Sequence, residues 1–206
     1  MPAQGFLPVR QLVLVDLLSL IVGTKPTERA IVAIDGDGSR HQRQLVAELL
    51  ALAPAVTDRD LVGVSTESFT APGSAAQTAA TGADYYREHY DHAQLHRGLL
   101  SPFQQGREVV IDPRNNPHDE PQLIEPSDTA ILVVSGPFLH RPELTSLWDA
   151  SLLVHPAGSG DDTSVASKAW EFYVEQSPAQ QARWVVDLSD PQRPHLLVVD
   201  PEDPVV

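Results

Sequence analysis

A short segment near the amino end combines residue types that hold phosphate groups in proteins. The apolar run 30–34 is followed by the sequence Asp-Gly-Asp-Gly-Ser at 35–39 and then by a helical pattern. Glycines allow the backbone to approach an anion closely, and the first turn of a helix presents N–H groups without intrahelical partners. The segment therefore contains a candidate phosphate loop, made of Gly36, Gly38, Ser39, Arg40, His41, Gln42 and Arg43.

The candidate loop departs from the phosphate-binding motif at the positions that do chemistry. That motif continues with Gly-Lys-Ser/Thr, in which the lysine contacts the phosphates and the hydroxyl binds magnesium. Counting from Gly36, these three positions hold His41, Gln42 and Arg43. Two interpretations stay open. Either the backbone still binds an anion, with Arg40 or Arg43 in place of the lysine, or the segment is a relic turn between a strand and a helix.

Two other polar residues are candidates for contact with a ligand. Asp35 ends the apolar run 30–34, and ligands of α/β sheets bind at the carboxyl ends of strands. Its alternative role is an Asp-Gly pair that only forms a turn. Arg141 either points into the same crevice or forms a surface ion pair with Glu143 or Asp149, and we favour the ion pair.

Three histidines are spaced so that a continuous helix would bring them to one face, namely His89, His92 and His96. Three neutral imidazoles with a nearby carboxylate would suit zinc. Three tyrosines between 85 and 90 favour a polar, aromatic wall instead, so we predict no metal site. Asp91, within the same segment, is predicted to cap or pair locally rather than to act in catalysis.

Composition argues against several classes of function. The 206 residues carry a formal charge of -14, which disfavours nucleic acid and anionic membrane surfaces as partners. Because the chain has no cysteine, disulfides, zinc-thiolate sites and cysteine nucleophiles are excluded. The apolar segment 12–22 contains Asp16 and is about half the length of a membrane span, and no signal-peptide pattern accompanies it. We therefore expect a cytoplasmic protein without a membrane partner.

The hydrophobic pattern predicts one α/β domain over residues 1–206. Helical spacing of apolar residues predicts helices at 9–22 and 44–52. Alternation of strands and helices favours a parallel sheet with helices on both faces. Loops are predicted at 70–82 and 112–128, and a frayed tail at 201–206. Six short apolar runs predict buried strands at 30–34, 61–64, 130–134, 151–154, 184–186 and 196–199.

Segments beyond the glycine loop add a resemblance to a known family. The chain reads Tyr-Tyr-Arg-Glu-His-Tyr-Asp-His from 85, Val-Ser-Gly-Pro-Phe-Leu-His-Arg-Pro-Glu-Leu at 134–144 and Asp-Leu-Ser-Asp-Pro-Gln-Arg-Pro at 187–194. Together with the loop, these segments resemble the uridine kinase-like branch of the P-loop kinases. They resemble its acceptor-side helix, its second acidic strand end with the following arginine-proline turn, and its late loop near the nucleotide base. The resemblance implies a P-loop kinase-like parallel sheet of about five or six strands.

The family's functional residues are only partly present. The resemblance places an acidic residue that orients or deprotonates the acceptor hydroxyl within 65–70, where Glu67 is the candidate base. The acidic residue expected before the glycine of a later strand is replaced by Ser135. Lid arginines that clamp the transferred group are missing, since Lys168 is the only arginine or lysine between 142 and 182. Phosphoryl transfer depends on positioning and on neutralising charge, so these losses remove most of the machinery.

We therefore interpret the chain as a degenerate, catalytically inactive kinase that needs no cofactor and is retained to bind a small molecule or a protein. The alternative is an active kinase that uses ATP and Mg to phosphorylate a small molecule or nucleoside. In that case Arg40 or Arg43 would hold the phosphates and Glu67 would be the base. A homodimer through the apolar stripe on 9–22 is a further hypothesis.

Overall fold

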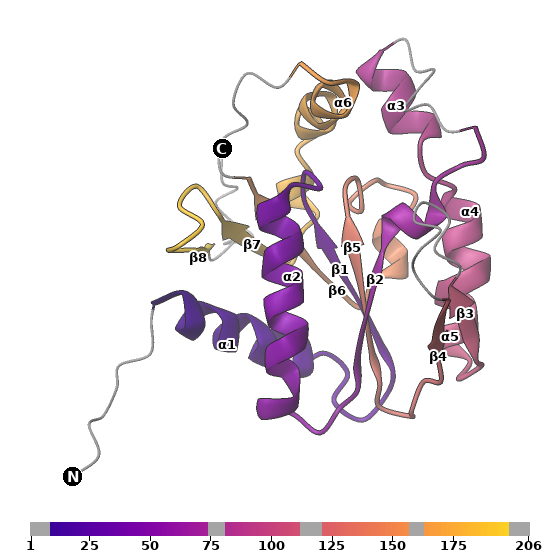
Figure 1. Ribbon diagram of the computed structural model, residues 1–206, viewed down its shortest axis with the longest axis vertical. Helices are drawn as coiled ribbons and strands as arrows, with labels where there is room; N and C mark the ends of the chain where they lie inside the picture. Colours follow the sequence, from indigo (N-terminus) through magenta and orange to yellow (C-terminus); the bar gives the residue numbers. More distant parts are fainter. Residues whose placement is uncertain (1–8, 74–80, 112–120, 157–162, 198–206) are drawn as a thin grey trace.

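The chain folds around a six-stranded sheet with helices on both faces (Figure 1). The computed structural model describes residues 9–73, 81–111, 121–156 and 163–197. The helices are α1 (Val9–Val22), α2 (Arg40–Leu52), α3 (Gly82–Glu88), α4 (His92–Leu95), α5 (Ser101–Gln104) and α6 (Val165–Val174). The strands are β1 (Ala30–Asp35), β2 (Leu61–Ser65), β3 (Val109–Ile111), β4 (Gln122–Ile124), β5 (Ile131–Gly136), β6 (Ala150–His155), β7 (Trp184–Asp187) and β8 (His195–Leu197). Single turns are η1 (Ala53–Ala55), η2 (Thr66–Phe69), η4 (Thr145–Leu147) and η5 (Pro178–Gln180), and η3 (His96–Leu100) is a π-helical turn.

The strand order of the large sheet is β2-β5-β1-β6-β7-β8, with β1 between β5 and β6. All neighbouring strands are parallel except β7 and β8, which pair antiparallel. The predicted parallel sheet of about five or six strands is confirmed, with this one difference at its edge. The short connection 188–194 explains it, because a parallel pair needs a crossover of a dozen or more residues. Residues 198–199 of the predicted last strand lie outside the described residues.

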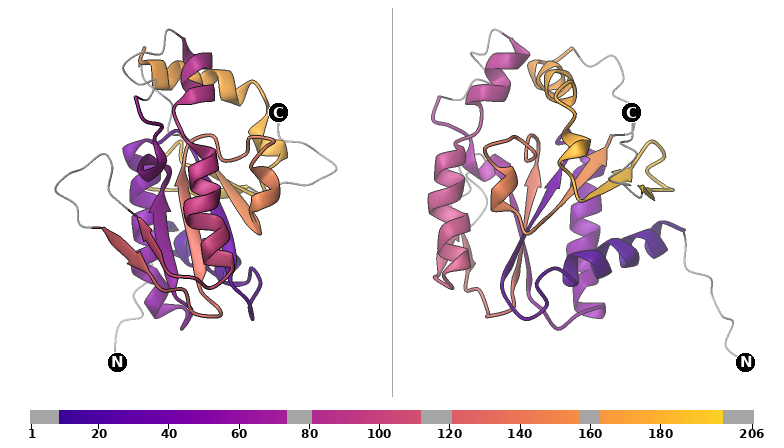
Figure 2. Two further views of the ribbon diagram at one scale, coloured as in Figure 1. Left: turned by 90° about the vertical axis from the view of Figure 1, so that its right-hand side faces the viewer. Right: turned by 180° about the vertical axis from the view of Figure 1, so that it is seen from behind.

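Alternation along the buried strands divides the core into two layers. Val32 and Ile34 of β1 pack with α1 and α2, while Ile31 and Ala33 pack with the opposite layer. Figure 2 shows α1 and α2 on one side of the sheet, and α4, α5 and the β3–β4 hairpin on the other. The carboxyl ends of the central parallel strands therefore lie together at one edge of the sheet, below α3 and α6.

The predicted amino-terminal helix is present with its expected buried face. Leu14, Leu17, Leu18 and Ile21 are buried and belong to the core layer that α2 also covers. The stripe is thus used inside the chain rather than presented to a second copy, and the homodimer stays a prediction. Within the described ranges, no helix combines the length and the apolar character needed to cross a membrane.

Several element boundaries differ from the sequence prediction. The helix predicted at 44–52 begins earlier, because the side chain of Ser39 accepts the N–H of Gln42 at 3.3 Å and caps the helix start. The loop predicted at 112–128 contains β4, a strand too short to give an alternating pattern. Gly82, at the end of the loop predicted from 70, already belongs to α3. Residues 74–80, 112–120 and the predicted tail 201–206 lie outside the described residues.

The burial of α1 gives the first testable prediction. Leu18→Ala removes a side chain that is fully buried against the sheet, and we expect it to lower the free energy of unfolding by about 2–5 kcal/mol. Leu12→Ala is the matched control, because Leu12 lies on the same helix and is 48% exposed. Its expected effect is within about 0.5 kcal/mol. Urea unfolding of both variants measures the difference, and equal stabilities would show that α1 does not belong to the core.

Candidate functional site

The candidate phosphate loop joins β1 to α2, as predicted. Gly38 has a φ of 72°, in the left-handed region that favours glycine. Asp37 closes a local turn, because its Oδ1 accepts the N–H of Ser39 at 2.9 Å. Two backbone donors at the helix start, those of Ser39 and Gln42, are thus bonded to side chains of the loop itself. They are donors of the kind that a phosphate would use.

The side chain of Gln42 turns back into the loop and fills it. Gln42 stands where the motif has its lysine, and it is only 2% exposed. Its Oε1 accepts the N–H of Gly38 at 2.7 Å, and its Nε2 donates to the carbonyl of Ile34 at 3.0 Å. The fit is close, since a Cβ added at Gly36 would lie 2.6 Å from the Gln42 Cδ. A neutral amide therefore occupies the space inside the loop. It also bonds to the N–H of Gly38, a donor of the kind that a phosphate would use.

The space that remains beside the loop is small. A pocket of about 20 Å³ lies between the loop, Glu67 and residues 135–137 at the carboxyl end of β5. This volume suits one water molecule and is too small for a phosphate group. The guanidinium of Arg43, which also lines the pocket, donates to the carbonyl of Gly38. Arg40 and His41 are exposed. The seven predicted loop residues are thus adjacent, but they are arranged around Gln42 rather than around an open site.

Glu67, the candidate base, lies near the loop and is hydrogen-bonded. Its Oε1 accepts the hydroxyl of Tyr90 at 2.7 Å, and Ser65 caps the turn that carries it. Burial, followed by the charge of Glu67, raises the pKa of Tyr90, so this phenol remains a donor. The same two causes raise the pKa of Tyr85 to about 12. A general base must take up a proton from the substrate, and one oxygen of Glu67 is already the acceptor of the hydrogen bond from Tyr90.

Asp35 is the centre of a buried polar network that sequence analysis did not find. It is 0% exposed, and its Oδ2 accepts the backbone N–H of His140 at 2.9 Å and the hydroxyl of Tyr173. The Nδ1 of His140 lies 2.7 Å from the same oxygen. Burial, then the charge of Asp35, raises the pKa of Tyr173. Asp35 therefore fixes α6 and the segment after β5 to the end of the central strand. It neither faces an open crevice nor only forms a turn.

Aromatic side chains pack together above the carboxyl ends of the central strands. Phe138 lies edge-on to Tyr86 and Tyr173, with ring centroids 5.2 Å and 5.3 Å apart. Phe138 has a φ of 68°, which is strained for a bulky residue and is held by this packing. The backbones of α3 and α6 meet at Gly82, where a Cβ would lie 2.6 Å from the carbonyl carbon of Lys168. Figures 1 and 2 show the two helices side by side above the strand ends.

The prediction that three histidines share one helix face is wrong. The helix is interrupted, since α3 ends before His89 and α4 begins at His92. The ring of His89 instead stacks on Tyr85, with centroids 4.1 Å apart. No group of three or more potential metal ligands lies together in the described part of the chain. Asp91 caps α4 by accepting the N–H of Gln94 at 2.8 Å, as predicted.

Arg141 is more deeply placed than a surface ion pair requires. It is 8% exposed, and its guanidinium carbon lies 4.3 Å from the ring centroid of Tyr86. It donates to the carbonyl of Tyr86 at 2.8 Å, and its Nη2 lies 3.4 Å from a carboxylate oxygen of Glu143. The predicted pair with Glu143 is present, but its main role is to hold the turn after β5 against α3.

Comparison with known proteins identifies the architecture. No family model matches the chain, and no curated protein matches its sequence. A structure described as a possible uridine kinase from Bacillus stearothermophilus aligns with a TM-score of 0.68 and 19% identity, over 85% of this chain and 98% of the other. A candidate fructose transport system kinase from Silicibacter aligns with a TM-score of 0.54 and 15% identity, over 84% of each chain. The chain has the P-loop kinase-like fold. The fold expected from the resemblance is confirmed.

The bond between α6 and β1 gives a second prediction. Tyr173→Phe removes a hydroxyl that donates to a buried carboxyl group, and we expect the free energy of unfolding to fall by about 1.5–3 kcal/mol. Tyr86→Phe is the matched control, because its hydroxyl makes one 3.3 Å bond to Gln176. The control is expected to lose less than about 1 kcal/mol. Equal losses in urea unfolding would contradict the anchoring role of Asp35.

His92 provides a prediction of pH dependence. Burial and the charge of Arg141 lower its pKa to about 4 from 6.5, although Glu143 and Asp91 act in the opposite direction. The unfolded chain therefore takes up this proton at a higher pH than the folded chain. The stability that neutral His92 contributes is present above about pH 6.5 and falls progressively toward pH 4. Between pH 6.5 and pH 4, the His92→Gln variant should lose less stability than the wild type. An NMR titration that places the pKa of His92 in the folded chain near 6.5 would contradict the prediction.

Proposed function

We propose that this chain is a non-catalytic relative of the P-loop kinases, retained to bind a small ligand or a protein partner. The buried side chain of Gln42 carries the proposal, because it replaces the motif's lysine and occupies the phosphate position. The proposal requires neither ATP nor Mg as a cofactor. It keeps the cytoplasmic location expected from the sequence.

Opening the loop for a nucleotide would be unfavourable. A phosphate would have to displace Gln42 from Gly38, and this movement would also break its bond to the carbonyl of Ile34. A buried polar group left without a partner costs about 1–3 kcal/mol. The attraction between an ammonium group and the phosphates would offset such a cost, but a neutral amide has no such attraction. The loop is therefore more stable closed on itself.

Other features of the fold support the same proposal. Glu67 is hydrogen-bonded to Tyr90, and Ser135 stands where the resemblance expects an acidic residue. Lys168, the one cation on α6, is exposed. The bond from Tyr173 to Asp35 holds this helix against the sheet. Since catalytic groups act as a unit, one surviving group cannot replace the others.

Nucleotide binding tests the proposal directly. With millimolar ATP and Mg, we expect the melting temperature of the wild-type chain to change by less than about 1 °C, because Gln42 leaves no room for a phosphate in the loop. Gln42→Ala removes the side chain that fills the loop and should produce a measurable stabilisation by inorganic phosphate or ATP. Gln44→Ala is the matched control, since Gln44 lies on the same helix, is exposed and bonds only to Glu48 among the side-chain contacts described.

The contrary outcome is equally clear. Magnesium-dependent stabilisation of the wild type, together with transfer of phosphate from ATP to a hydroxyl compound, would establish an active kinase. In that case Glu67→Gln and Arg43→Ala should each abolish turnover without unfolding the chain. Binding of ATP without transfer would contradict the closed loop but not the absence of catalysis.

A further inference from the structure

A second cavity lies away from the phosphate loop, beside the carboxyl end of β6. It has a volume of about 350 Å³, within the range of small-molecule sites. Its apolar walls come from Leu153 of β6, from Trp170 and Val174 of α6, and from Pro178 and Ala179 of η5. Three elements that follow one another in the chain, β6, α6 and η5, thus enclose one hollow.

The course of α6 explains why this hollow exists. Leu153 points to the opposite face of the sheet from Leu152, which belongs to the core beneath α1 and α2. Because α6 packs on α3 above the strand ends, it does not lie flat over this part of the sheet (Figure 1). The small residues Ala179 and Ala182 pack beside Leu153. Apolar space of this kind lowers stability, and a larger side chain at Ala179, which lines the cavity, would fill it.

One wall of the cavity is a fixed aromatic surface. The ring of Trp170 packs against Tyr173 and Phe138, with centroids 5.3 Å and 6.3 Å apart. Tyr173 is in turn bonded to Asp35, so this indole is supported from behind by the buried network. A ligand ring that contacts Trp170 therefore meets a wall that is already ordered, and little conformational entropy is lost on binding.

The polar groups of the cavity set the charge of its ligand. His155, Ser177 and Gln180 line it, and together they offer hydrogen-bond donors and acceptors. Ser177 has a φ of 54°, which is unusual for a residue other than glycine and turns the chain at the rim. No lysine, arginine, aspartate or glutamate is among the described residues that line the cavity. A charged ligand would lose its hydration without gaining an opposite charge, so a neutral one is favoured.

We infer that this cavity is a binding site for a small, neutral, planar heterocycle, which packs against Trp170 and hydrogen-bonds to His155 or Gln180. This inference goes beyond the proposed function, because it does not depend on whether the phosphate loop is closed. The site lies on the other side of β6 from the layer that contains α2. It would therefore remain usable in a chain that transfers no phosphate.

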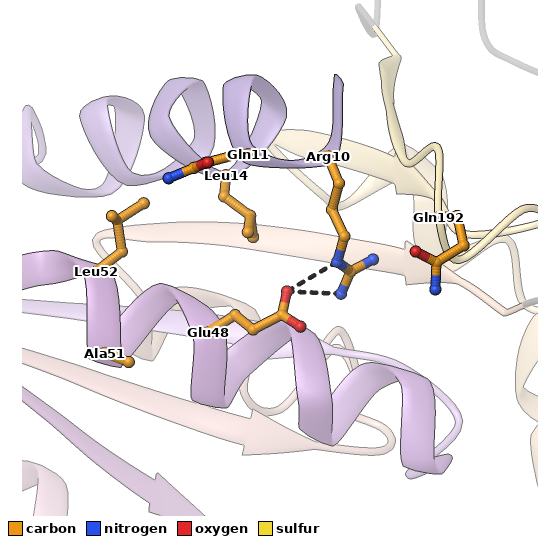
Figure 3. A pocket seen from close by; sticks show the side chains of 7 residues that line it. All are labelled: Arg10, Gln11, Leu14, Glu48, Ala51, Leu52 and Gln192. Carbon is orange, nitrogen blue, oxygen red and sulfur yellow. Dashed lines mark hydrogen bonds and ion pairs between the residues drawn. The ribbon is translucent and has the colours of Figure 1, made fainter. Parts of the chain in front are cut away.

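The groove between α1 and α2 differs in the features that favour a ligand. Its volume is about 560 Å³, but Arg10 and Glu48 form an ion pair within it, with atoms 2.8 Å apart (Figure 3). Arg10 also donates to the carbonyl of Pro191. Its charged groups are thus engaged with the chain, and it has no aromatic wall among its described lining residues. Ala51, which lines this groove, provides a matched position for control substitutions.

An NMR titration of the full chain with benzimidazole at neutral to slightly basic pH tests the inference. Benzimidazole is planar and uncharged there, with one donor and one acceptor nitrogen. We expect saturable shifts of the Trp170 indole N–H and of the backbone signals at 153–156 and 177–180. Cyclohexanol, which has a hydroxyl but no aromatic ring, should bind more weakly. Gln42→Ala should leave the benzimidazole titration unchanged.

Substitutions that fill one pocket or the other separate this site from general apolar binding. Ala179→Leu should weaken benzimidazole binding by about tenfold or more, because it places a larger side chain in the cavity. Ala51→Leu makes the same change in the other groove and should have no effect. Val174→Lys should also weaken benzimidazole binding, because Val174 lines the cavity. Val174 is 45% exposed, so this second test does not depend on the folding of the first variant. The inference would be overturned if benzimidazole caused no saturable shifts, or if the shifts were confined to Arg10 and Ala51. Unchanged binding to a folded Ala179→Leu variant would also overturn it.

Discussion

A buried carboxyl group at the end of the central strand determines how the upper part of this molecule is arranged. Transfer of such a group from water is unfavourable unless donors surround it. The Oδ2 atom of Asp35 meets this requirement with His140 and Tyr173, which come from two other parts of the chain, whereas its Oδ1 has no hydrogen-bond partner among the described residues. The position of α6 depends on these bonds, and the contact of α6 with α3 follows from that position. The aromatic cluster and the cavity beside β6 then occupy the spaces that this arrangement leaves.

The loop between β1 and α2 is stabilised by the side chains of its own residues. Gln42 does more than lack an ammonium group, since its amide satisfies both Gly38 and Ile34. Arg43 stands at the serine or threonine position of the phosphate-binding motif, and its guanidinium donates to the carbonyl of Gly38. Internal bonds thus hold the loop between β1 and α2 closed on itself. Close similarity of fold is compatible with this change, because fold alone does not determine chemistry.

The sequence predicted those features that depend on local periodicity. The buried face of α1 and the central strands both follow from residue types that lie close together in the sequence. The bond from Tyr173 to Asp35 spans 138 positions, and nothing local marks it. The inward turn of Gln42 was equally hidden, because a polar residue in the first turn of a helix ordinarily faces solvent. The break between α3 and α4 was missed since helical spacing alone does not reveal a cap such as Asp91.

The direct contact of two helix backbones at Gly82 has a consequence for motion. Without a side chain at this point, α3 and α6 approach more closely than ordinary packing allows, and the ring of Tyr86 lies against those of Phe172 and Tyr173. Interdigitated surfaces of this kind resist sliding. The two helices would therefore travel as one rigid body, with exposure of the strand ends requiring a single collective displacement rather than the separate movements of a hinged flap.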